Sequence, residues 1–269
     1  MFGPLAQWSK RWTRVSRLGI HFARGMVIAA VLFPLQSSER RKREIEHWSL
    51  QLLDRLNVRL FLHGMPPQYG GRPLMVVSNH VTWLDIFAIN AVVPARFVAK
   101  SEMRGWPLIG WLSTRTGSLF IDRTKRYDTV RINHAVSAAL KAGDVFAVFP
   151  EGTTTDGSTV LKFHASLLEP AVEADAVVQP VALWYERADG TLCTEVSYSG
   201  GNSMWDTLMA ITSHHEVRVH VCFLEPILPF SRHRRDIARE ARDAILLTLY
   251  PQARDSRIDT DADLPAEVH

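Results

Sequence analysis

The sequence has few of the residues from which disulfide frameworks and cysteine metal sites are built. Its 269 residues include only two cysteines, Cys193 and Cys222, which lie well apart and have no second pair. Small disulfide-stabilised domains and paired-cysteine zinc sites both need more cysteines at closer spacing. The cysteine content therefore favours a protein that works in a reducing, cytosolic setting.

The motifs of several large enzyme classes are also missing. The segment Tyr198-Ser199-Gly200-Gly201 lacks the first glycine of a nucleophile elbow. His214-His215-Glu216 lacks the His-Glu-x-x-His spacing of a zinc hydrolase, and adjacent histidines do not share a helix face, so we expect loop residues there. No Walker-type phosphate loop or dinucleotide fingerprint occurs. Serine hydrolase, zinc and nucleotide chemistry are therefore disfavoured, and no metal is expected.

Long hydrophobic runs are absent as well. The most apolar segment, from Gly25 to Leu35, is shorter than the ~20 residues that a membrane-spanning helix needs, and His21 and Arg24 bound it on one side. It is not followed by a small-residue cleavage pattern, which disfavours a signal peptide. We therefore expect a peripheral or monotopic protein.

Basic residues are abundant at the start of the chain. The net charge is only +3 and the pI about 9.0, but nine cations near the N-terminus stand against a single acid, Glu39: Lys10, Arg11, Arg14, Arg17, Arg24, Arg40, Arg41, Lys42 and Arg43. In a helix over residues 5–22, one face would carry Leu5, Trp8, Trp12, Val15, Leu18 and Phe22. Tryptophans opposite arginines are typical of a helix in a membrane interface. The alternative is a helix packed on its own domain with a solvated basic face.

A second helix is predicted after the apolar segment, with Ser38 as its cap and with Ile45, Trp48, Leu52 and Leu56 on one face. Beyond it, β-rich runs alternate with helical ones. Strands are predicted at 58–62, 73–77, 95–99, 118–121, 144–149, 177–184, 192–198 and 217–223. Helices are predicted at 82–92, 106–113, 129–142, 161–171, 205–212 and 233–249.

This alternation predicts an α/β fold with a mixed, largely parallel sheet flanked by helices. We expect three parts: an amphipathic two-helix layer for membrane contact at 1–57, a single catalytic domain at 58–250, and an acidic, disordered tail at 251–269.

Polar side chains follow three of the predicted strands. His80, Asp122-Arg123 and Glu151-Gly152 each come directly after an apolar run. Ligands of open α/β sheets bind beyond the carboxyl ends of the strands, so we expect these residues to share a crevice.

His80 and Asp85 suggest a general base with its orienting carboxylate. Five residues of α-helix turn through about 500°, so the two side chains cannot share a helix face. With His80 in the preceding loop and Asp85 in the first turns, the carboxylate reaches one ring nitrogen and leaves the other for a substrate. Asn79 or Thr82 would cap the helix or support the loop. The spacing alone is also compatible with an ordinary histidine beside a helix-start aspartate.

Four blocks together resemble the glycerolipid acyltransferases that acylate lysophosphatidic acid. Asn-His-x-x-x-x-Asp at 79–85 and Phe-Pro-Glu-Gly-Thr at 149–153 are that family's signature, and the segments 117–123 and 178–182 are similar to its second and fourth blocks. The resemblance runs from about Leu74 to Pro226. One departure stands out: many members have arginine where this chain has Thr154.

The resemblance implies a mechanism and a set of site residues. His80 would take the proton of a lysolipid hydroxyl that attacks an acyl thioester, and Asp85 would orient it. Arg123 would hold the acceptor phosphate, Glu151, Gly152 and Thr153 would line the acceptor site, and Lys100 is a further anion contact. No cofactor is expected; the thioester is carried by coenzyme A or acyl carrier protein.

The implied reaction is acylation of the sn-2 hydroxyl of 1-acyl-glycerol 3-phosphate to phosphatidic acid, in phospholipid biosynthesis at the cytoplasmic face of the cell membrane. The missing arginine at position 154 leaves another lysolipid, such as lyso-ornithine lipid, open as acceptor. A membrane-peripheral lipid-binding protein without catalysis is the alternative from a different class. No nucleic acid partner is expected.

Overall fold

The structure, a computed structural model, describes residues 4–67, 70–106, 108–122 and 124–251. Its centre is a seven-stranded sheet in the order β1-β7-β6-β2-β5-β3-β4. All neighbouring strands are parallel except β6 and β7. The strands are β1 Val58–His63, β2 Leu74–Ser78, β3 Arg96–Lys100, β4 Leu119–Ile121, β5 Val145–Val148, β6 Val177–Arg187 and β7 Val217–Phe223. The predicted mixed, largely parallel sheet is confirmed.

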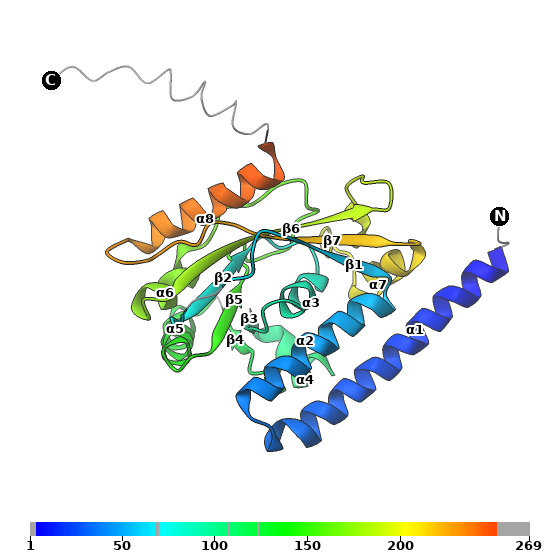
Figure 1. Cartoon of the computed structure of the whole chain (residues 1–269), viewed down its shortest axis with the longest axis horizontal. Coiled ribbons are helices and arrows are strands. Elements are labelled where there is room, and N and C mark those ends of the chain that lie inside the picture. Colours follow the sequence, from blue (N-terminus) through cyan, green and yellow to red (C-terminus); the bar gives the residue numbers. More distant parts are fainter. Residues whose placement is uncertain (1–3, 68–69, 107, 123, 252–269) are drawn as a thin grey trace.

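Helices cover both faces of this sheet (Figure 1). The longer ones are α1 Pro4–Val27, α2 Ser38–Arg55, α3 Leu84–Asn90, α4 Ile109–Arg115, α5 Arg126–Lys141, α6 Glu169–Glu173, α7 Met204–Ser213 and α8 Arg234–Leu249. Strand β2 is buried along its whole length. Its successive side chains Val76 and Val77 belong to different hydrophobic clusters. This is the pattern of a central strand with both faces covered, because successive side chains of a strand point to opposite faces.

Two of the predicted elements are wrong. The segment 192–198 is no strand but a bridge at Leu192 followed by a 3₁₀ turn, η5 Thr194–Val196. The segment 161–171 is not one helix, because only η4 Ala165–Leu168 and α6 are helical. Its first backbone groups bind elsewhere: the Leu161 N–H donates to Glu151, and Arg242 donates to the carbonyls of Val160 and Leu161. Those tertiary bonds compete with a helical turn at this place.

Helix α1 is longer than the predicted amphipathic segment. It continues into a π-helical turn, η1 Ile28–Leu32, and a 3₁₀ turn, η2 Phe33–Leu35. The stretch Trp12–Leu35 contains an 18-residue window with a mean hydropathy of 1.8, so it is long and apolar enough to cross a membrane by length and composition alone. Our length-based exclusion of a span is wrong, because the helix runs on past His21 and Arg24.

One side of α1 packs on the domain, as the alternative interpretation of this helix expected. Leu18 is buried in the core, and His21 lies against Trp48 of α2: the rings stack at 4.5 Å and His21 Nε2 lies 3.0 Å from the Trp48 carbonyl. Of the apolar residues that stay exposed here, Ile20, Val27 and Val31 recur at helical spacing. They form an exposed apolar stripe on α1 and the η1 turn that continues it, and none of the three belongs to the predicted face.

Candidate active site

His80 and Asp85 are in contact where β2 gives way to α3. The His80 Nδ1 lies 2.7 Å from the Asp85 Oδ2, and Asp85 is in the first turn of α3, folded back toward the loop. A carboxylate only accepts hydrogen bonds, so the Nδ1 carries the proton and the Nε2 lone pair is the one left to accept a proton. The His80 side chain is 20% exposed, so a substrate can reach it. The geometry expected for a base with its orienting carboxylate is observed.

The Asp85 carboxylate is fully buried and receives four hydrogen bonds. Besides His80, its Oδ2 accepts from the backbone N–H groups of Val81 at 2.7 Å and Thr82 at 2.9 Å. Its Oδ1 accepts from the Tyr185 hydroxyl at 2.7 Å. These donors stabilise a charge that burial would otherwise disfavour, and they hold the carboxylate in one orientation.

Tyr185 is a site residue that the sequence analysis missed. It lies on β6, and its phenol is buried on the inner face of the sheet. Burial, together with the Asp85 carboxylate, raises the pKa of Tyr185 well above its usual range, so the phenol stays protonated and donates. No motif marks this residue, because it lies 100 positions from Asp85 and meets it only when β2 and β6 pair.

Glu151 holds the backbone of His80. Its Oε1 accepts from the His80 N–H and its Oε2 from the Leu161 N–H, both at 2.7 Å. The side chain is buried, and this burial raises the pKa of Glu151, although the two backbone hydrogen bonds and His80 oppose the shift. Both carboxylate oxygens thus serve the fold, which favours a positioning role over contact with an acceptor.

The rest of the Phe-Pro-Glu-Gly-Thr block also supports His80. The Phe149 ring stacks on the His80 ring at 3.9 Å, almost parallel at 8°. Gly152 closes the turn at a φ of +77°, a conformation that favours glycine, and its N–H donates to the Phe149 carbonyl. After the turn, the Thr155 N–H donates to the His80 carbonyl at 2.9 Å. The loop therefore clamps both backbone polar groups of His80.

The other residues predicted to bind substrate are less closely placed. Thr153 is exposed in the turn, and Lys100 is exposed at the end of β3. Thr154, at the position where the family resemblance leads us to expect arginine, donates from its hydroxyl to the Tyr198 carbonyl. Arg123 lies outside the described residues.

The predicted meeting of three strand ends is observed for two of them. His80 and Glu151 follow the neighbouring strands β2 and β5 and touch each other. Asp122 follows β4, which is separated from β2 by β5 and β3. It binds locally, to Thr124 and Lys125. The sheet order, which the sequence did not show, separates β4 from β2 by about three inter-strand spacings, or ~14 Å.

The side chain of Asn79 completes the sheet beside the base. It donates to the Leu183 carbonyl and accepts from the Leu183 N–H, both at 2.8 Å. Asn79 is therefore a support of the loop, one of the two roles expected for it, while the Thr82 hydroxyl makes no hydrogen bond to any residue that the structure describes.

An apolar cavity of about 180 Å³ opens beside the start of α3. It lies between the N-terminal helices and the segment around α4, and Trp83, two residues before Asp85, is part of its wall. Its lining includes Phe22, Trp48, Phe87, Ala99, Met103 and Leu112. Such a lining suits a hydrocarbon chain rather than a polar ligand.

Comparison with known proteins identifies the family of this chain. The sequence model described as Acyltransferase matches residues 59–184. A lyso-ornithine lipid O-acyltransferase of Pseudomonas aeruginosa is 36% identical, over 79% of this chain and 81% of its own length. A 1-acyl-sn-glycerol-3-phosphate acyltransferase of Neisseria meningitidis is 37% identical, over 60% and 63%.

Among solved structures, the 1-acyl-sn-glycerophosphate acyltransferase PlsC of Thermotoga maritima is similar, with a TM-score of 0.64 and 22% identity. The likeness covers 90% of this chain and 98% of that one, and it concerns the fold. Because of its sequence similarity to these relatives, the chain belongs to the acyltransferase family and is an enzyme of the lysolipid acyltransferase type.

Proposed function

We propose that this acyltransferase uses His80 as the general base in direct transfer of an acyl group from a thioester to a lysolipid hydroxyl. The pairing of His80 Nδ1 with Asp85 carries the proposal, because it leaves the Nε2 lone pair for the incoming hydroxyl. The Nε2 takes the hydroxyl proton as the oxygen attacks the thioester carbonyl carbon. The carbon–sulfur bond then breaks, and the thiolate leaves with the proton returned by the imidazolium.

No covalent acyl-enzyme is required in this scheme. Holding the alcohol and the thioester together supplies much of the acceleration. The apolar cavity beside Trp83 is suited to an acyl chain. The donor is a thioester of coenzyme A or of acyl carrier protein, and no cofactor takes part.

As acceptor we propose 1-acyl-glycerol 3-phosphate, with phosphatidic acid as product. The 37% identical Neisseria relative carries that activity in its name, and Arg123 is the cation that the family resemblance assigns to the phosphate. A guanidinium suits phosphate geometry.

Lyso-ornithine lipid is the second candidate, favoured by two observations. The Pseudomonas relative named for that acceptor matches a larger share of this chain, and Thr154 supplies a hydroxyl bound to the Tyr198 carbonyl where many relatives have arginine. We place the enzyme on the cytoplasmic face of the membrane, where its basic, tryptophan-bearing start meets anionic lipid.

The test is an acyl-transfer assay of purified protein with a panel of lysolipids and both thioester donors. We expect turnover with 1-acyl-glycerol 3-phosphate, and a loss of about 10²- to 10⁴-fold in His80→Ala with membrane association retained. Preferential turnover of lyso-ornithine lipid would move the assignment to the second candidate. Unchanged activity in His80→Ala would refute the mechanism, and lipid binding without turnover would favour the non-catalytic alternative.

A further inference from the structure

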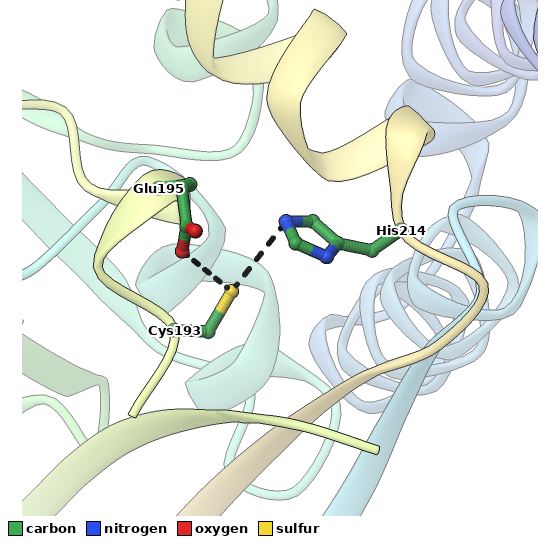
Figure 2. A group of neighbouring side chains, drawn as sticks. All are labelled: Cys193, Glu195 and His214. Carbon is green, nitrogen blue, oxygen red and sulfur yellow. Dashed lines mark hydrogen bonds between the residues drawn. The ribbon is translucent and has the colours of Figure 1, made fainter. Parts of the chain in front are cut away.

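Three side chains of the types that bind metals converge outside the His80–Asp85 pair, where the chain leaves β6 and where α7 ends. Cys193 and Glu195 belong to the segment around η5, and His214 follows the last residue of α7 (Figure 2). The Cys193 Sγ lies 3.5 Å from the Glu195 Oε2 and 3.9 Å from the His214 Nε2. All three ligand atoms lie within 4.8 Å of one another.

We propose that Cys193, Glu195 and His214 bind a divalent transition metal of the zinc type, with water as the fourth ligand. Thiolate, imidazole and carboxylate are the usual donors to Zn²⁺, and bonds of ~2.0–2.3 Å in a tetrahedron place neighbouring donor atoms about 3.3–3.6 Å apart. The two sulfur contacts in Figure 2 are within a few tenths of an ångström of that range. A side-chain rotation of Glu195 or His214 would bring the three ligand atoms from within 4.8 Å of one another to the spacing that a tetrahedral metal needs.

The chemistry of the group fits a metal better than a reactive cysteine. A cysteine nucleophile needs an imidazole that is itself oriented by a carboxylate. Here the carboxylate contacts the sulfur instead of the ring (Figure 2). The thiol is also buried, whereas reactive cysteines are partly exposed to their substrates. On binding, the metal–sulfur bond replaces the sulfur–hydrogen bond, and the proton passes to solvent.

Arg187 sets the orientation of the carboxylate. Its Nη2 lies 2.5 Å from the Glu195 Oε1, which leaves the Oε2 directed at the cluster. Partners of this kind commonly hold metal ligands in place from outside the first coordination sphere.

The site would brace two parts of the molecule that matter for the enzyme. Arg14 of α1 donates to the carbonyls of Thr212 and His214, so His214 is part of the surface on which α1 packs. On the other side, Ser197 donates to the carbonyl of Thr155, whose N–H donates to the His80 carbonyl. We therefore expect a structural metal whose binding changes stability rather than the chemical step.

The test uses the full chain in detergent, stripped with a chelator and titrated with Co²⁺. We expect one equivalent to bind with a sulfur-to-cobalt charge-transfer absorption, and the melting temperature to rise on binding. Cys193→Ser is expected to abolish the charge-transfer absorption. The matched control is Cys222→Ser, which removes the only other cysteine and is expected to leave the absorption unchanged.

A second variant covers the event that Cys193→Ser does not fold. His214→Gln removes a partly exposed ligand and is expected to weaken cobalt binding by about 10- to 100-fold. In the parent protein, Zn²⁺ is expected to protect the Cys193 thiol from alkylation. Two results would overturn the proposal: cobalt binding without a charge-transfer absorption, or an unchanged cobalt affinity in His214→Gln. Either result would leave Cys193 as a buried thiol hydrogen-bonded to Glu195.

Discussion

At the scale of single residues, the proposed base His80 depends on a carboxylate that is itself held from three sides. Asp85 receives backbone N–H groups from its own loop, the imidazole of His80, and the phenol of Tyr185 from a distant strand. Each bond removes a freedom that the carboxylate would have in water. Residues that never touch the substrate are therefore expected to affect the rate.

Tyr185→Phe tests this dependence. Loss of the phenol makes the Asp85 carboxylate a stronger base, which stabilises the His80 imidazolium. We expect kcat/KM to fall about tenfold, equivalent to ~1.4 kcal/mol, and its acidic limb to move to higher pH. The control is Tyr127→Phe, which changes an exposed tyrosine. A fall in kcat/KM without a shift in the pH profile would show that Tyr185 acts only through packing.

Asp85→Asn tests the orientation of the imidazole. The asparagine amide presents N–H groups toward donors that the carboxylate now accepts from, and it favours the wrong tautomer of His80. We expect a fall in kcat of about 10²- to 10⁴-fold with little change in KM. The double variant with His80→Ala is expected to be no slower than His80→Ala alone, since the pair acts as a unit. Additive losses in steady-state kinetics would contradict this.

Glu151→Gln tests the buried carboxylate through stability. Burial raises the folded-state pKa of Glu151 above its ordinary value of 4.5, so the folded protein holds this proton more tightly than the unfolded chain. That contribution is fully present below pH 4.5 and is lost as the pH rises through the folded-state pKa. The wild type should therefore gain stability relative to Glu151→Gln on acidification. Parallel unfolding curves at all pH values would show that Glu151 does not titrate as described.

At the scale of elements, the walls of the apolar cavity come from segments far apart in the sequence. Phe22 and Trp48 lie on the N-terminal helices, Ala99 on β3, and Leu112 on α4. The N-terminal helices are thus a part of the proposed acyl site as well as the proposed membrane contact.

Ala99→Phe narrows this cavity and tests its use. We expect the ratio of kcat/KM for short-chain over long-chain thioesters to rise by about tenfold or more, because the added ring removes room from the cavity. The control is Ala142→Phe, at an exposed position after α5. An unchanged chain-length profile in competition assays would exclude this cavity as the acyl site.

At the scale of the whole molecule, α1 and the η1 turn that continues it have one side packed on the domain and one side exposed. The packed side contributes Leu18 and His21 to contacts with the domain, whereas Ile20, Val27 and Val31 form the exposed apolar stripe. Deleting residues 1–36 would remove core residues together with the stripe. Point substitutions on the exposed side are therefore the cleaner test of membrane contact.

Val27→Asp combined with Val31→Asp is expected to release the protein from anionic vesicles. Charges on the stripe oppose its burial in a lipid interface, while the domain contacts of α1 stay intact. We expect activity toward substrates in detergent to remain within about twofold, since surface changes of this kind usually have small effects on the fold. Undiminished flotation with vesicles would show that the stripe does not bind lipid.

Much of this protein was predictable from local pattern. Strand β7 lies where it was expected, and α8 begins within one residue of its prediction, because alternation and helical spacing depend on neighbouring residues. The same holds for the contact of His80 with Asp85, which needs only a loop and one helical turn. The failures at 161–171 and 192–198 lie where side chains from other elements bind the backbone.

The sequence by itself determined the α/β class and the contact of His80 with Asp85, since each rests on residues close together along the chain. The chemical type followed from the resemblance of four sequence blocks to a known family. Only the tertiary structure decided that Tyr185 completes the base, that Glu151 supports it, and that Cys193, Glu195 and His214 meet. For Tyr185 and Glu151 the physical reason is strand order. Pairing of β2 with β5 and β6 brings residues that are 70 to 100 positions apart within 3 Å, and no local periodicity encodes that choice.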